Sequence, residues 1–240
     1  MPDRRPLALV TGAARGIGAE VARQLADAGY EVIVAARDLD AAERHAASLR
    51  AEGAEAAPVQ LDITEPHEVA ALAGVLGDRP LDVLVNNAAA FADWSETATT
   101  ADLDTAHTVL EANLFGAWRV VQAALPALRR APNARIVNVG SGAGSHGELQ
   151  FGLSSGPASA SYAISKAALH ALTVKLAVEL RPDGILVNAV DPGLTATAPG
   201  MEAMGARPVP AGARSVVWAA LLPADGPTGT FTRDGAPLPW

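Results

Sequence analysis

Hydrophobic positions along the chain alternate between short apolar runs and longer stretches with helical spacing. The short runs are rich in β-branched residues, and several are apolar at successive positions, which is typical of strands covered on both faces. Strands are predicted at 7–11, 31–35, 56–61, 81–85, 135–139, 185–190 and, with a weaker pattern, 229–231. Helices are predicted to begin near Gly16, Leu39, Glu65, Thr100, Ser161 and Ala211.

This alternation predicts an α/β fold: a Rossmann-type, doubly wound parallel sheet of about seven strands with helices on both faces. No repeat or low-complexity linker divides the sequence, so 1–240 is expected to form one domain. Two segments break the pattern, a Gly- and Ser-rich stretch at 141–161 and a stretch with four prolines at 192–210. Both follow strands, so we expect both at the carboxyl edge of the sheet, where such sheets bind ligands.

Composition narrows the class of protein. The chain has 240 residues, half of them apolar, a formal net charge of −8 and no cysteine, which excludes a disordered chain, a disulfide framework and a thiolate nucleophile. The acidic balance argues against nucleic-acid binding, and no apolar run is long enough for a membrane span. Residues 1–6 show no signal peptide, so a cytoplasmic location is expected. The five histidines lack metal-ligand spacing, so no metal site is expected.

The first predicted strand runs into TGAARGIG at positions 11–18. Glycines there allow a tight turn and let a diphosphate approach the backbone, while the following helix N-terminus supplies free N–H groups. The spacing differs from the usual dinucleotide fingerprint, and no Lys-Ser/Thr follows as in a triphosphate loop. We expect cofactor contacts from Gly12, Arg15, Gly16, Ile17 and Gly18.

The end of the second strand indicates which dinucleotide binds. An acidic residue there would favour a ribose 2′-hydroxyl, whereas this chain has Ala35-Ala36-Arg37. Arg15 and Arg37 suit a 2′-phosphate, through forked, charge-assisted hydrogen bonds. The sequence therefore predicts NADP(H) over NAD(H); the alternative for Arg37 is a solvated arginine at a helix start.

Several further motifs appear in one order along the chain. They are Asp62, Asn86-Asn87-Ala88, Asn113, Ser141, Tyr162-x-x-x-Lys166 and Pro192-Gly193. With the glycine turn, they make the sequence resemble the short-chain dehydrogenase/reductase family over nearly its whole length. The segment 221–240 resembles the carbonyl-reductase-like branch of that family.

The resemblance implies a catalytic set of Asn113, Ser141, Tyr162 and Lys166. Tyr162 and Lys166 are four residues apart, so they share one face of a predicted helix. We expect the ammonium and the nicotinamide of the oxidised cofactor to lower the pKa of Tyr162, which would act as the proton donor. Ser141 would stabilise the substrate oxygen, with Ser145, Ser154 and Ser155 as rivals for that position. Asn113 would anchor a water that relays protons to Lys166.

Further contacts carry over from the family. Lys166 would hold the nicotinamide ribose, Asp62 would accept from the adenine amino group, and Ile63 would lie beside it. The remaining cofactor contacts expected from the family are Asn86, Ala88, Pro192, Gly193 and Thr197. Asp62 could equally cap the following helix.

The substrate side is less defined. Ser141, His146, Phe151 and Leu194 are the candidate substrate contacts, and Trp94 lies in a polar loop where it could form a substrate wall. Trp118 is expected to pack in the core. Asp191 stands where the carbonyl-reductase-like branch usually has an uncharged residue; it either faces the nicotinamide or points outward.

The sequence thus predicts an NADPH-dependent reductase of an aldehyde, ketone or quinone. Three alternatives stay open: oxidation of an alcohol by the same site, a non-catalytic NADP-binding regulator, and, less favoured, a dehydratase or epimerase. The expected partner is a small-molecule carbonyl or alcohol. A homo-oligomer through the helices after the fourth and fifth strands is a further alternative.

Overall fold

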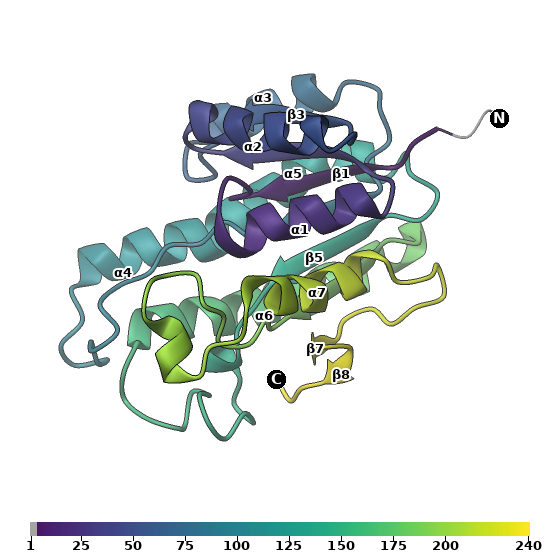
Figure 1. Ribbon diagram of the computed structural model, residues 1–240. Coiled ribbons are helices and arrows are strands. Elements are labelled where there is room, and N and C mark those ends of the chain that lie inside the picture. Colours follow the sequence, from purple (N-terminus) through teal and green to yellow (C-terminus); the bar gives the residue numbers. More distant parts are fainter. Residues whose placement is uncertain (1–3) are drawn as a thin grey trace.

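The computed structural model describes residues 4–240. The first three residues, part of the 1–6 segment in which no signal peptide was expected, lie outside the described residues. One eight-stranded sheet runs through the molecule in the order β3-β2-β1-β4-β5-β6-β7-β8 (Figure 1). The strands are β1 (Leu7–Thr11), β2 (Glu31–Ala36), β3 (Ala56–Gln60), β4 (Val83–Asn86), β5 (Arg135–Val139), β6 (Leu186–Val190), β7 (Phe231–Arg233) and β8 (Ala236–Pro237).

The strands β1 to β7 are parallel, which confirms the predicted doubly wound sheet. The eighth strand was missed: β8 pairs antiparallel with β7, and with two residues ending in a proline it has no apolar run to mark it. β4 begins at Val83 rather than at 81, where the N–H of Leu81 donates to the carbonyl of Ala127, which lies in a helix, instead of to a strand.

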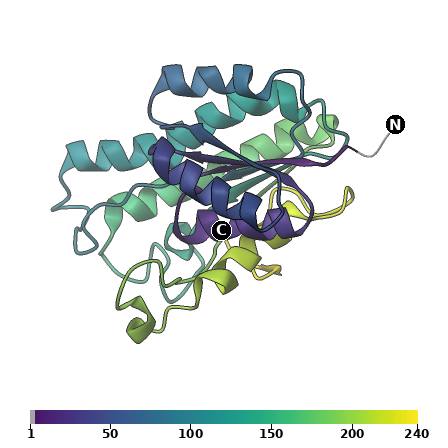
Figure 2. The ribbon, with the colours of Figure 1, turned by 45° about the horizontal axis from the view of Figure 1, so that its top comes forward.

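Helices cover both faces of the sheet (Figures 1 and 2). The α-helices are α1 (Gly16–Asp27), α2 (Leu39–Ala51), α3 (Pro66–Leu76), α4 (Leu103–Leu110), α5 (Ala117–Leu128), α6 (Ala160–Leu180) and α7 (Val209–Ala220). A π-helical turn, η1 (Glu111–Gly116), joins α4 to α5. Three short 3₁₀ turns complete the helical elements: η2 (Gly142–Gly144), η3 (Arg181–Asp183) and η4 (Met201–Met204).

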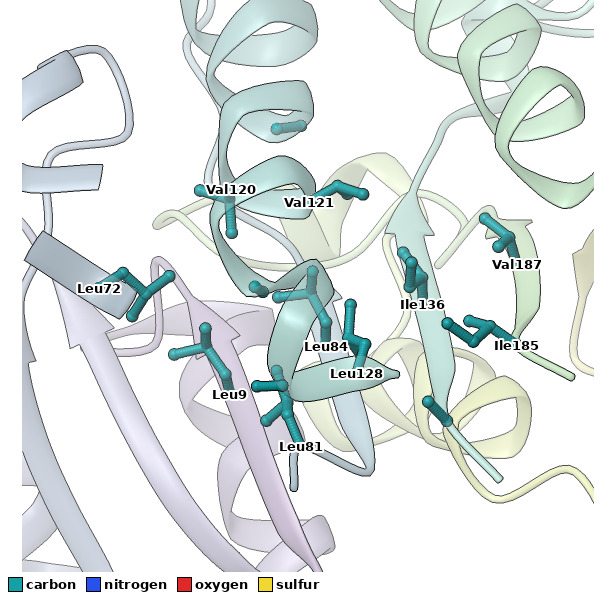
Figure 3. Packing of buried hydrophobic residues seen from close by; sticks show 14 of the residues in the cluster. Leu9, Leu72, Leu81, Leu84, Val120, Val121, Leu128, Ile136, Ile185 and Val187 are labelled. Carbon is teal, nitrogen blue, oxygen red and sulfur yellow. The ribbon is translucent and has the colours of Figure 1, made fainter. Parts of the chain in front are cut away.

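Two apolar clusters hold the layers together. One packs α3, α5 and α6 against the sheet through buried side chains such as Leu72, Val121 and Ile136 (Figure 3). The other packs α1, α2 and α7 on the opposite face, around Val10 and Val34. Because strands such as β1 are buried on both faces, they consist of consecutive apolar residues rather than alternating ones.

The parallel strands end at one edge of the sheet, and the loops after β4, β5 and β6 gather there (Figure 1). These loops include the predicted 141–161 and 192–210 segments, which therefore lie where expected. Within residues 4–240, no helix combines the length and apolar character that a membrane crossing needs.

Candidate active site

Tyr162 and Lys166 lie in the first two turns of α6, at the carboxyl edge of the sheet. The Lys166 Nζ is 5.5 Å from the centroid of the Tyr162 ring, so the i, i+4 spacing brings the two together as predicted. Lys166 is only 3% exposed, and its Nζ donates to the carbonyl oxygen of Val139 at 2.8 Å. This bond ties the helix to the end of β5.

Ser141 follows β5 and caps the short turn η2, where its Oγ accepts from the N–H of Ala143 at 3.2 Å. Its side chain also makes a hydrogen bond with Tyr162. Of its rivals, Ser145 is fully buried and donates to the Pro239 carbonyl, whereas Ser154 and Ser155 are exposed. Among these serines, Ser141 is therefore the one that makes a hydrogen bond with the Tyr162 side chain, and its contact with the substrate stays a prediction.

The pKa of Tyr162 differs from the expectation. Burial raises it above its ordinary value, the negative charge of Asp191 raises it further, and the hydrogen bond with Ser141 lowers it. The expected lowering by Lys166 is wrong for the protein alone, because the ammonium is directed at the Val139 carbonyl and is itself desolvated. Burial lowers the pKa of Lys166 to about 8. The phenol is thus protonated at neutral pH, which is the form a proton donor needs.

Asn113 lies in the π-helical turn η1 and is buried. Its Oδ1 accepts from the N–H of Ala90 at 2.7 Å, and its Nδ2 donates to the Ala90 carbonyl and to Ser165 Oγ at 3.0 and 2.9 Å. The side chain therefore joins the loop after β4 to the helix that carries Tyr162. Turns of this kind are frequent at functional sites. The water that Asn113 was expected to anchor stays a prediction.

Two aromatic residues of the loop after β4, Phe91 and Trp94, form what we term the aromatic cover of Tyr162. Phe91 stacks on the Tyr162 ring with centroids 4.9 Å apart, and Trp94 meets it edge-on at 5.5 Å. The buried Glu96 carboxylate accepts from the N–H of Ser161 at 2.7 Å, which fixes the loop to the start of α6. Sequence reasoning missed Phe91; its signal was an aromatic pair in an otherwise polar loop.

The glycine turn between β1 and α1 leaves no room for side chains. A Cβ on Gly18 would lie 2.3 Å from Asn87 Nδ2 and 2.4 Å from the Gly12 carbonyl oxygen. Asn87 holds the turn by donating to the carbonyls of Thr11 and Gly12 at 2.9 and 3.2 Å. Sequence reasoning did not single out Asn87. Asn86, which was expected to contact the cofactor, donates through its Nδ2 to Asn138 on β5.

The start of α1 fits a dinucleotide diphosphate. Arg15 at the N-cap makes no side-chain capping bond, and the first turn holds no acidic residue, so the backbone N–H groups around Ile17 are left for an anion. Gly16 has a positive φ of 57°, and a Cβ there would lie 3.4 Å from Thr197 Cγ2, which places the loop after β6 beside the turn.

Arg15 and Arg37 flank this turn. Ala13 N–H donates to the Ala35 carbonyl at 3.0 Å, so the end of β2 lies next to the glycine turn. Both arginines are exposed, and no ion pair within residues 4–240 engages either of them. The neighbouring Asp38 carboxylate caps α2 by accepting from the N–H of Ala41. The two guanidinium groups at this position suit a 2′-phosphate, while the Asp38 carboxylate is directed at the start of α2.

Three further residues that were expected to contact the cofactor have different surroundings in the structure. Asp62 Oδ1 accepts from the N–H and hydroxyl of Thr64 at 2.9 and 2.7 Å, so it shapes its own turn, close to the capping alternative. Ile63 is buried against Gly116, where an added Cβ would lie 2.8 Å from Ile63 Cγ1. Ala88 N–H donates to Thr11 Oγ1, which fixes the strand ends side by side.

The loop residues on the substrate side are mostly open to solvent. His146, Phe151 and Leu194 are exposed, and their contact with substrate stays a prediction. A hollow of about 540 Å³ lies inside the loop after β6 and is lined by Thr197, Pro199 and their neighbours rather than by Tyr162. Asp191 is 4% exposed, so of its two alternatives the outward-facing aspartate is excluded, and its place beside the nicotinamide stays a prediction.

Comparisons with known proteins agree with this geometry. Residues 6–206 match a family model described as short chain dehydrogenase. The rhamnolipids biosynthesis 3-oxoacyl-[acyl-carrier-protein] reductase of Pseudomonas aeruginosa is 35% identical over 195 residues, covering 78% of this chain and 72% of its own. A putative ketoacyl reductase of Streptomyces coelicolor is 38% identical over 198 residues, covering 80% and 71%.

Solved structures are also similar. The NADPH-bound carbonyl reductase from chicken fatty liver has a TM-score of 0.84 at 27% identity, over 99% of this chain and all of that one. A 3-oxoacyl-[acyl-carrier protein] reductase from Brucella melitensis with bound NAD has a TM-score of 0.83 at 27% identity, over 97% and 91%. The resemblance seen in the sequence is confirmed: this chain belongs to the short-chain dehydrogenase family of oxidoreductases, which act on alcohol and carbonyl groups.

Proposed function

We propose that the protein reduces the carbonyl group of an aldehyde, ketone or quinone to an alcohol with NADPH. The observation that carries the proposal is the protonated, half-buried Tyr162, bonded to Ser141 and held one helical turn from Lys166. Oxidation of an alcohol at the same site is the reverse reaction. A raised pKa of Tyr162 favours the reducing direction, because the phenol starts with its proton.

The residues divide the work of one reaction step. The cofactor supplies the hydride that adds to the carbonyl carbon. Ser141 donates a hydrogen bond to the carbonyl oxygen and stabilises its growing charge, and Tyr162 transfers its hydroxyl proton to that oxygen, which completes the alcohol. Lys166 would bind the nicotinamide ribose hydroxyls, and with the cofactor in place its positive charge would stabilise the phenolate left on Tyr162.

The choice of NADPH rests on charge. The carbonyl reductase from chicken holds NADPH and the Brucella reductase holds NAD, so similar folds take either dinucleotide. In this chain Arg15 and Arg37 are exposed beside the glycine turn, and the adjacent carboxylate of Asp38 is used as a helix cap. Two free guanidinium groups suit the 2′-phosphate that distinguishes NADPH.

The substrate class follows from the aromatic cover. Phe91 and Trp94 are 54% and 59% exposed although they pack on Tyr162, so a flat apolar group can stack on them next to the reacting hydroxyl. This favours an aromatic or conjugated carbonyl. A second candidate is a 3-oxoacyl thioester, which is favoured by the relatives at 35% identity that reduce 3-oxoacyl-[acyl-carrier-protein].

Apolar side chains on one side of the molecule support a homo-oligomer. Trp118, which was expected in the core, is 41% exposed, and Phe115 lies exposed beside it. Leu103 on α4 and Val178 on α6 are exposed as well. We infer that a second copy covers this face, formed by α4, η1, α5 and α6. A cytoplasmic location stays a prediction of the sequence.

The test mixes the purified protein with NADPH and a panel of aromatic ketones, quinones, aliphatic aldehydes and a 3-oxoacyl thioester, and follows the loss of reduced-nicotinamide absorbance. We expect turnover that falls by about 10²–10⁴-fold in Tyr162→Phe, while NADPH binding is retained. Binding of NADPH without turnover of any carbonyl would instead favour the regulator.

A further inference from the structure

Asp191 directly follows β6 and precedes Pro192-Gly193, and its buried carboxylate joins three segments. Oδ1 accepts from the N–H of Gly193 at 2.7 Å, and Oδ2 accepts from the N–H of Gly142 at 3.0 Å. Arg233 on β7 donates to the same Oδ2 through Nη2 at 2.5 Å and Nε at 3.2 Å. One side chain thus connects the loops after β5 and β6 to the C-terminal strands.

The contact with Gly142 bears directly on the site. Gly142 is the residue after Ser141 and opens the turn η2 that Ser141 caps. A Cβ on Gly142 would lie 3.1 Å from Asp191 Oδ2 and 3.3 Å from Arg233 Nη2, so the turn sits closely over the ion pair. Movement of the carboxylate would therefore move the backbone that carries the Ser141 hydroxyl.

The carboxylate is also a charge beneath the reacting groups. The negative charge of Asp191 acts on Tyr162, Lys166 and His170 of α6. It adds to the raised pKa of Tyr162 and opposes the lowering by burial of the pKa of Lys166 and His170. On the other side Arg233 offsets this charge and is itself near Glu148 and Asp234. Asp234 is in turn paired with Arg207 at 2.8 Å and lies near Arg214.

We propose that Asp191, paired with Arg233, is a positioning residue of the active site that holds Ser141 in place and sets the charge beneath Tyr162 and Lys166. The assignment rests on the proposed function of Tyr162 as proton donor. Both carboxylate oxygens accept a backbone N–H, from Gly193 and from Gly142, and an amide with a single acceptor oxygen could not accept both bonds.

The test uses two variants that change the charge in opposite directions. Asp191→Asn keeps one acceptor oxygen and removes the other together with the negative charge, whereas Arg233→Gln keeps both acceptor oxygens and leaves the charge without its partner. We expect the alkaline limb of the reduction rate, which reports the pKa of the Tyr162–Lys166 pair, to move down by about 0.5–1 pH unit in Asp191→Asn and up in Arg233→Gln.

Asp82→Asn is the matched control, since Asp82 also accepts a backbone N–H and pairs with an arginine, Arg4 at 2.7 Å, at the opposite end of the sheet. It should lower the thermal midpoint as the other variants do and leave the pH profile unchanged. Two results would overturn the proposal: the alkaline limb moves in the same direction in Asp191→Asn and Arg233→Gln, or it does not move although both variants lose stability as Asp82→Asn does. Either result would leave the pair with a structural role only.

A second measurement does not need turnover. The chain has two tyrosines, so Tyr30→Phe leaves Tyr162 as the only phenol, whose titration can be followed by NMR of ¹³C-labelled tyrosine with NADP⁺ present. The midpoint should fall in Asp191→Asn and rise in Arg233→Gln. A wild type that reduces no carbonyl would remove the proposed function, whereas equal midpoints in the three proteins would remove the role of Asp191.

Discussion

The glycine turn after β1 and the Ser141 turn after β5 lie at the same edge of the sheet, yet different means hold them in place. The glycine turn depends on missing side chains, because Gly12 and Gly18 let Asn87 bond directly to the backbone. The Ser141 turn depends on buried polar side chains, above all Asp191 and Lys166. The cofactor side is therefore sensitive to added volume, and the substrate side is sensitive to changes in charge.

The largest effect is expected where volume is added to the glycine turn. Gly18→Ala places a Cβ against the Gly12 carbonyl, so the free energy of unfolding should fall by about 3 kcal/mol and NADPH binding should be lost. Urea denaturation and cofactor titration measure both. Gly74→Ala is the control, because a Cβ on Gly74 of α3 would meet no atom within 4 Å. Its free energy of unfolding should rise by about 0.5–1 kcal/mol. Equal behaviour of the two variants would contradict the close fit.

A charge change on the cofactor side should alter selectivity and spare the fold. Arg37→Asp removes a phosphate contact and adds repulsion, which should lower the preference for NADPH over NADH by about 10- to 100-fold. The ratio of kcat/KM for the two cofactors measures it. Arg181→Asp, exposed in η3, should leave the ratio unchanged. An unchanged preference in Arg37→Asp would refute the assignment of the 2′-phosphate.

The buried His170 should make the substrate side sensitive to acid. Burial and the nearby Lys166 lower its pKa to about 4, against an ordinary value near 6.5. Below about pH 6.5 the imidazole of His170 is protonated in the unfolded chain but stays neutral in the folded protein. The free energy of unfolding therefore falls as the pH is lowered from about 6.5 towards 4. Between about pH 7 and pH 5 the loss should be about 2 kcal/mol.

Urea denaturation at both pH values measures this loss. In His170→Gln, which cannot titrate, the difference between the two pH values should shrink by the same amount. His45 is half-buried on the cofactor side, and His45→Gln serves as the control. The same pH dependence in wild type and His170→Gln would show that another group is responsible.

The smallest effect concerns the aromatic cover. Phe91→Ala removes one ring from the Tyr162 stack, worth about 0.5–1.5 kcal/mol for an aromatic pair, so KM for an aromatic ketone should rise about two- to tenfold. KM for a small aliphatic aldehyde should stay the same. Leu39→Ala, which truncates an exposed side chain on α2, should change neither value. Equal changes for both substrates would contradict stacking.

Features that depend on a local sequence pattern could be predicted from the sequence. Apolar runs placed the parallel strands within a few residues, since strands buried on both faces leave a strong local pattern. Tyr162, Lys166 and Ser141 were found through helical spacing and the order of motifs, and the structure brings them together. The glycine turn was likewise recognisable, because a strand, glycines and a helix follow one another directly.

Features made by distant segments could not be read in this way. Asp191 meets Arg233 across 42 positions of sequence, and Glu96 reaches Ser161 across 65. The pKa of Tyr162 depends on burial, which no single segment determines. Asn86 was a candidate and Asn87 was not, and only the structure shows that Asn86 bonds to Asn138 at the end of β4 while Asn87, just beyond it, holds the glycine turn.

The π-helical turn η1 (Glu111–Gly116) sets both the position of Asn113 and the direction of the exposed apolar face. Compared with an α-helix, this turn contains one additional residue. Because each residue rotates a helix by about 100°, the additional residue determines which way the side chains of α5 point. A single deletion there would swing the Phe115–Trp118 face away from its present direction and also displace Asn113 from Ala90 and Ser165. Removing the π-helical turn would therefore change the position of Asn113 and the direction of the exposed apolar face together.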